Sequence, residues 1–88
     1  MDKKFLNKVV DQIVRETEID YDKEEIQFPF FSDSSSFRFY SSYILVSIYV
    51  PSSLTKHCKD VYGLNEQEID YVWEEYKHII KDKIDNGL

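Results

Sequence analysis

The sequence predicts a small single α+β domain with an N-terminal amphipathic helix, a short antiparallel β-hairpin or meander, and a C-terminal α-hairpin. In that α-hairpin a short helix precedes a long one. Three observations predict this class. Apolar residues recur with helical periodicity near both ends, β-branched and aromatic residues gather in the middle, and Pro51 and Gly63 stand where elements should end. A chain of 88 residues suits one domain over residues 1–88, with a small core.

The first helix is expected over residues 3–18. Asp2 precedes it and is a residue type that caps a helix N-terminus. Its apolar residues share one stripe, with polar residues opposite, which predicts that the helix docks on a core. The stripe consists of Phe5, Leu6, Val9, Val10, Ile13 and Val14.

Residues 19–25 are interpreted as an acidic connection. Residues 16–25 contain six acids in ten positions, and charges this dense repel one another and favour solvent. Asp20, Asp22 and Glu24 have the spacing of the first ligands of a calcium loop. However, a glutamate stands in place of the turn glycine and a phenylalanine in place of the final acid. We therefore expect no metal and no cofactor.

Residues 26–51 form a region rich in serine and aromatic residues, for which strands are predicted. They are expected at about 37–40 and 43–50. A third is expected near 26–31, where Pro29 would confine it to an edge or to an irregular arm. The segment 43–50 is apolar on both faces, and so short a chain has little with which to cover the second face. The predicted interaction surface therefore consists of Phe37, Phe39, Tyr43, Val46, Ile48 and Val50.

Two helices are expected after Pro51, over residues 53–62 and 66–85. Leu54, Cys58 and Val61 form the apolar stripe of the first, and Gly63 is suited to end it in a left-handed conformation. The second begins with the most specific local pattern in the chain. Asn65 and Glu68 have the spacing of a capping box. Its inward stripe consists of Ile69, Val72, Trp73, Tyr76, Ile79, Ile80 and Ile84.

The net charge of −6 bears on the classes of partner. Phosphate backbones and anionic membranes attract clustered Lys and Arg, so we expect no direct nucleic acid and no membrane. The longest apolar stretch has eight residues, far short of the roughly 20 that span a bilayer. The single cysteine cannot form an internal disulfide, which suits a reducing compartment. A soluble, cytoplasmic protein is expected.

Nucleic-acid binding was considered at two places in the sequence. The last two helices resemble a loose helix–turn–helix, but the second would present acids to phosphate. The segment 37–40 has aromatic residues suited to stacking on bases, but Arg38 is its only charge. Core packing or a protein contact is the better interpretation of both.

No residue pattern predicts catalysis. Cys58 lies on an apolar stripe, where a thiol is usually buried and inert. His57, Cys58 and His78 offer too few ligands for a structural zinc, and two glycines are too few for a phosphate loop. We expect no enzyme and no catalytic, cofactor-binding or metal-binding residues.

Two hypotheses for the function stay open. The first is a small non-catalytic protein–protein interaction or assembly module that uses its apolar middle to bind a protein partner or a second copy, as a homodimer. The alternative is an acidic, DNA-mimic-type inhibitor of a nucleic-acid-binding protein. The richness in Ile, Lys, Tyr, Asp and Glu is compatible with an AT-rich genome, such as that of a phage or virus.

Overall fold

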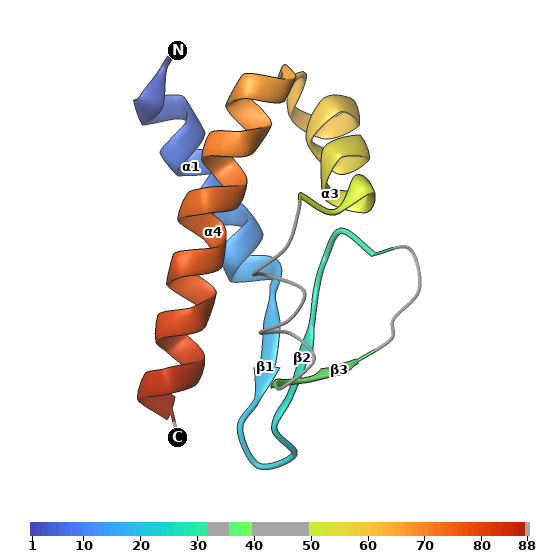
Figure 1. Cartoon of the computed structure of the whole chain (residues 1–88), viewed down its shortest axis with the longest axis vertical. Coiled ribbons are helices and arrows are strands. Elements are labelled where there is room, and N and C mark those ends of the chain that lie inside the picture. Colours follow the sequence, from blue (N-terminus) through green and yellow to red (C-terminus); the bar gives the residue numbers. More distant parts are fainter. Residues whose placement is uncertain (32–35, 40–49, 88) are drawn as a thin grey trace.

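The computed structural model describes residues 1–31, 36–39 and 50–87. Two long helices, α1 (Lys3–Glu16) and α4 (Glu66–Gly87), cross beside a small sheet and a shorter helical segment (Figure 1). Helices lie toward both ends of the chain, and antiparallel strands lie between them. The predicted α+β class is confirmed.

Helix α1 begins at Lys3 because Asp2 caps it. The Oδ1 atom of Asp2 accepts a hydrogen bond from the Phe5 backbone N–H at 3.1 Å. Four residues of the predicted stripe are buried, whereas Phe5 is 42 % exposed at its margin. The helix ends at Glu16, two residues before the predicted end, because Thr17 is extended.

The acidic run forms a β-hairpin, whereas the sequence predicted a connection over residues 19–25. Strand β1 (Glu18–Asp20) pairs antiparallel with β2 (Glu25–Gln27), and β2 pairs with β3 (Phe37–Arg38) in the order β1-β2-β3. Alternation explains the difference. Ile19 and Ile26 lie directly opposite each other and pack toward the core. The acidic residues beside them in the strands point to the other face, toward solvent.

An edge strand or an irregular arm was expected near residues 26–31. Residues 28–31 are irregular, and residues 26–27 belong to strand β2. It is the central strand, and it ends at Gln27, before Pro29 would interrupt the hydrogen-bonded ladder. Of the strand predicted at 43–50, residues 43–49 lie outside the described residues. Val50 is described, and it is half-buried against the core without strand pairing.

The helix predicted over 53–62 is two segments of different winding. α3 (Ser52–His57) is α-helical, and η1 (Cys58–Tyr62) is a π turn that ends at Gly63, whose φ is +66°. A π turn is wider than an α turn, so it changes which residues share a face. Val61 is consequently 60 % exposed, although the sequence placed it on the buried stripe.

The capping box predicted for α4 is confirmed. Asn65 Oδ1 accepts from the Glu68 backbone N–H at 2.9 Å, and Glu68 Oε1 accepts from the Asn65 backbone N–H at 3.0 Å. The helix continues to Gly87, two residues past the predicted end. Its buried residues are Ile69, Val72, Trp73, Tyr76, Ile80 and Ile84.

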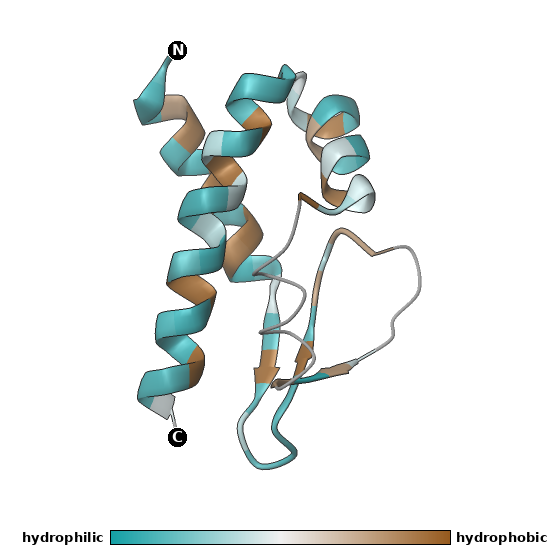
Figure 2. Cartoon of the chain, in the orientation of Figure 1, coloured by the Kyte–Doolittle hydropathy of each residue, from teal (hydrophilic) through white to brown (hydrophobic). Residues whose placement is uncertain are grey.

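α4 packs mainly along α1, and we call this contact the seam. Three hydrogen bonds join the two chain segments in the same order along each, so α1 and α4 run parallel (Figure 1). They link Asn7 with Tyr71 at 2.8 Å, Thr17 with Tyr76 at 2.7 Å, and Tyr21 with the Lys83 carbonyl at 3.1 Å. Figure 2 shows apolar and polar residues alternating along both helices, as one-sided burial requires.

Residues 28–31, which we call the aromatic arm, extend the core beyond the sheet. The Phe28 ring centroid lies 5.3 Å from that of Phe30 and 5.7 Å from that of Phe37. The Phe30 centroid lies 5.8 Å from that of Tyr76, with the rings edge to face. These contacts fix the arm to α4.

The longest helix of the described residues, α4, has 22 residues. None of the helices in this part of the chain combines the length and the apolar character needed to cross a bilayer.

Candidate functional site

A concavity of about 400 Å³ separates the aromatic arm from α3 and η1, and we call it the arm groove. Its two walls come from segments more than twenty residues apart in the chain. One wall is Pro29, Phe30 and Phe31, and the other is Ser53, Lys56, His57, Asp60 and Val61.

The wall formed by the arm is held in place by ring contacts. Phe31 is half-buried, and its centroid lies 5.1 Å from that of Phe30 and 5.2 Å from that of Phe37. Phe30 is buried and also touches Tyr76. The wall is therefore a packed, preformed aromatic surface.

The opposite wall owes its shape to the π turn. The wider winding leaves Val61 exposed while Cys58 stays buried on the inner side. At the rim, Lys56 Nζ donates to Asp60 Oδ2 at 2.7 Å, and this pair is exposed. The hydrogen bond and the attraction of the Asp60 charge raise the pKa of Lys56. The groove thus has an apolar wall and a charge-neutral rim.

Two polar atoms of this wall are buried without a partner. Ser53 Oγ and His57 Nε2 have no hydrogen-bond partner in the part of the chain that the structure describes. Both side chains are half-buried, and the His57 ring meets Tyr62 edge to face at 6.0 Å. Buried polar groups are nearly always paired in folded proteins, so this turn of α3 is unusual.

Cys58 lies on the inner side of the π turn and does not line the groove. Its side chain is fully buried, and burial raises the pKa of the thiol from its ordinary value of 9.0 to about 11. A thiol with so high a pKa is a poor nucleophile at neutral pH. Among residues 1–31, 36–39 and 50–87, no three His, Cys, Asp or Glu side chains cluster so as to hold a metal ion.

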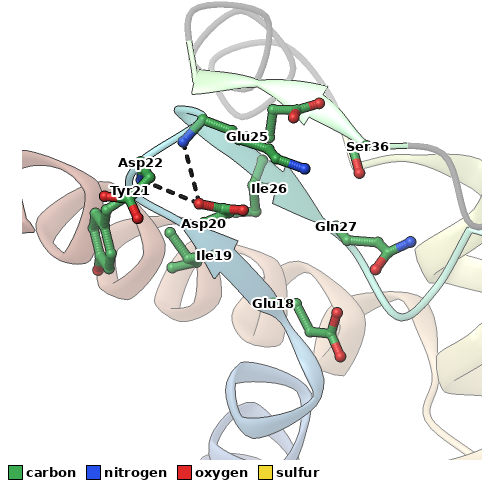
Figure 3. Close-up of a pocket in the computed structure, with 10 residues that line it drawn as sticks. Glu18, Ile19, Asp20, Tyr21, Asp22, Glu25, Ile26, Gln27 and Ser36 are labelled. Carbon is green, nitrogen blue, oxygen red and sulfur yellow. Dashed lines mark hydrogen bonds between the residues drawn. The ribbon is translucent and has the colours of Figure 1, made fainter.

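A second concavity, of about 710 Å³, lies at the β-hairpin, and we call it the acidic hollow (Figure 3). Four carboxylates and one cation line it, together with Ile19, Tyr21, Ile26, Gln27 and Ser36; the charged residues are Glu18, Asp20, Asp22, Lys23 and Glu25. Figure 3 shows the Asp20 carboxylate folded back over the turn. Its Oδ1 accepts from the backbone N–H groups of Asp22 and Lys23, both at 3.1 Å. Asp20 therefore holds the turn through its Oδ1 atom.

The six residues of the predicted interaction surface are only partly described. Phe39 is 4 % exposed and meets Tyr21 edge to face at 6.1 Å. Phe37 and Val50 are half-buried and pack on the core. Tyr43, Val46 and Ile48 lie outside the described residues. The described members thus serve the core at least as much as a surface.

Sequence reasoning did not find the arm groove. Ser53, His57 and Val61 are spaced by four residues, a spacing that also suits a solvated helix face. Nothing in the local pattern signals that the aromatic arm returns beside them.

Comparison of this chain with protein-family models, with curated proteins and with solved structures gives no match.

Proposed function

We propose that the chain is a small non-catalytic module that binds another protein through its apolar middle, with the arm groove as the contact site. The observation that carries the proposal is the groove itself. A preformed aromatic wall faces an exposed valine, which the fold leaves uncovered. Protein interfaces commonly have such an aromatic and apolar centre inside a polar rim.

The module needs no other chemistry from the residues around the groove. Phe31 provides rigid apolar area backed by the buried Phe30 ring, and the Lys56–Asp60 pair frames it with little net charge. Such a groove fits one bulky side chain of a partner as an anchor. We further propose a reducing, cytoplasmic setting, because Cys58 is buried as a free thiol.

The proposal is tested with a photo-reactive benzoylphenylalanine placed at Val61. A matched control carries the same group at Glu75, which is exposed on α4 away from the groove residues. Irradiation in the protein's own cells should give a discrete adduct from position 61 only, and Phe31→Asp should prevent it. Equal labelling from both positions, or none from position 61, would contradict the proposal.

Self-association is one form of the same function. Light scattering on a size-exclusion column, over a range of concentrations, measures whether the purified chain forms a homodimer. If a dimer forms through the groove, Val61→Asp should dissociate it, whereas Glu75→Lys should not. Val46→Lys and Ile48→Lys extend this comparison to the rest of the predicted surface.

The acidic hollow favours a second candidate function, an inhibitor that mimics nucleic acid. Four carboxylates against one cation present a negative surface at the hairpin. Because Asp20 holds the turn, the informative charge reversals are Asp22→Lys and Glu25→Lys. An inhibitor should lose its ability to displace DNA from its target protein, whereas a module that uses the arm groove should keep its partner.

A further inference from the structure

The unpaired polar atoms of α3 point to the kind of partner that the arm groove takes. We propose that the groove recognises a tyrosine side chain of the partner protein, whose phenol hydroxyl pairs with Ser53 Oγ and His57 Nε2. This inference rests on the proposed function and specifies its occupant.

The first step is that neither of these two atoms has a hydrogen-bond partner among residues 1–31, 36–39 and 50–87. Ser53 lies in the first turn of α3, yet no side chain caps that helix. The His57 ring packs on Tyr62, but its Nε2 is buried and unpaired. Leaving a buried polar atom unpaired costs free energy, whereas an apolar residue at either site would avoid that cost.

The second step is that the two atoms share one location. Ser53 and His57 are four residues apart on a helix, so they lie on the same face, one turn from each other. Both line the same groove. The two exceptions to hydrogen-bond pairing among the described side chains therefore coincide with the candidate site. Local rules are most often broken at functional sites.

The third step concerns access. Each side chain is half-buried, so part of it borders the groove although its polar atom is covered. A change between staggered rotamers moves a serine hydroxyl or a histidine ring without moving the backbone. Because both polar atoms are covered in the free structure, the proposed contact requires such a change at both side chains.

The fourth step is the chemistry of the occupant. A phenol hydroxyl both donates and accepts, which suits a serine hydroxyl and either tautomer of a histidine. Its ring matches the aromatic wall formed by Phe30 and Phe31. A phenylalanine side chain would leave both atoms unpaired, and a charged side chain would lose its hydration in an apolar groove.

The experiment compares p-cresol, the tyrosine side-chain analogue, with toluene, the phenylalanine analogue. Amide chemical shifts of the ¹⁵N-labelled full chain follow binding at Phe31, His57 and Val61. We expect p-cresol to bind at least about tenfold more tightly than toluene, because an apolar analogue leaves the polar atoms unsatisfied. Equal affinities, or no shift of these amides with p-cresol, would overturn the inference.

A double variant tests whether the two residues cause the preference. Ser53→Ala with His57→Phe should bind p-cresol and toluene equally. The matched control is Ser52→Ala with His78→Phe, which changes the same residue types at exposed positions and should keep the preference. If the first double variant still bound p-cresol more tightly than toluene, the assignment of Ser53 and His57 would be wrong.

A second measurement uses the free protein. If Ser53 and His57 are kept for a ligand, the first double variant should have a urea midpoint at least equal to that of the unaltered chain. A clear drop would show that the two residues serve the fold, and would overturn the inference. Position 61 would still cross-link to a partner in that case, so failure of this inference is distinguishable from failure of the proposed function.

Discussion

The seam and the arm groove are both places where distant parts of the chain meet, and they treat polar groups differently. In the seam, Thr17 donates its hydroxyl hydrogen to the Ile13 carbonyl, so the Tyr76 hydroxyl donates to Thr17. Among the described residues, no buried side-chain polar atom of the seam is left unpaired. In the groove, Ser53 Oγ and His57 Nε2 have no hydrogen-bond partner within the same described ranges. The buried polar groups of the seam are therefore paired within the fold, and those of the groove are the exception.

The protonation of the Tyr76 hydroxyl supports the same contrast. Burial raises the pKa of Tyr76, and the hydrogen bond with Thr17 opposes the rise only in part. The phenol therefore stays protonated over the physiological range and remains a hydrogen-bond donor. The polar pair of the seam is thus a permanent structural contact and is not a titrating group.

The largest expected effect comes from removing the bulkiest buried ring of α4. Trp73 is buried, and its ring stacks on Tyr76 with centroids 6.1 Å apart. Trp73→Ala should cost about 3–5 kcal/mol of unfolding free energy. A domain this small has on the order of 5 kcal/mol in total. We expect loss of most helical circular dichroism at 25 °C.

The groove provides the control for that experiment. Val61→Ala changes an exposed side chain, so its unfolding free energy should stay within about 0.5 kcal/mol of the unaltered value. If Val61→Ala were as damaging as Trp73→Ala, the groove would belong to the core and the comparison would fail.

A double-mutant cycle measures the buried polar pair. Thr17→Val leaves the Tyr76 hydroxyl buried and unpaired, so it should destabilise by about 1–3 kcal/mol. Adding Tyr76→Phe should recover part of this loss, because both partners are then apolar. Urea unfolding of the four proteins gives the coupling energy. Strict additivity would mean that the pair contributes nothing.

Alkaline pH probes the inner side of the π turn. Cys58 has a raised pKa of about 11 in the folded protein, against 9.0 ordinarily, so the folded state holds the proton longer. Below pH 9 the thiol is protonated in both the folded and the unfolded state, and its contribution to the unfolding free energy is complete. As the pH rises toward 11, the unfolded state loses this proton first, and the unfolding free energy falls by on the order of 1–2 kcal/mol.

Cys58→Val is the matched variant for this measurement. Its unfolding free energy should fall less steeply between pH 9 and pH 11 than that of the unaltered chain. Tyr76 also has a raised pKa, but Cys58 is not among its causes, so it contributes the same slope in both proteins. Burial, and after it the Glu16 and Cys58 charges, raise the pKa of Tyr62, so the difference reports the thiol together with its effect on Tyr62. Identical slopes would show that the thiol is not buried in solution.

The smallest effect is expected at the outer end of the seam. The Tyr71 hydroxyl donates to Asn7 Oδ1 at 2.8 Å, but this bond is exposed. Water replaces a lost partner there, so Tyr71→Phe should cost about 0.5 kcal/mol or less. Thermal unfolding of the Tyr71→Phe and Thr17→Val variants then compares two cross-helix hydrogen bonds that differ in burial. Equal costs would argue against burial as the cause.

The sequence predicted the elements that have long periodic patterns. α1 and α4 have apolar stripes of several turns, and the capping box at Asn65 has a specific chemistry. It missed β1 because three residues are too few for alternation to stand out from a dense run of acids. The usable signal was Asp20 before a polar turn, flanked by two isoleucines in polar surroundings.

The candidate site was beyond sequence reasoning for a different reason. The local pattern placed Val61 on the buried stripe of a regular helix, and only the change to π winding exposes it. The aromatic residues were recognised as a group, but which ring packs inward and which borders a groove depends on α4. Phe31 and His57 become neighbours of one groove only through tertiary packing.

The parallel course of α1 and α4 has a consequence for synthesis and folding. The hydrogen bonds of the seam join residues 59 to 64 positions apart, so the partners on α4 are synthesised well after those at α1. Until then the apolar stripe of α1 lacks its main cover, α4. Closing so long a loop before the core forms should make this a slower folder than a helical bundle of equal size.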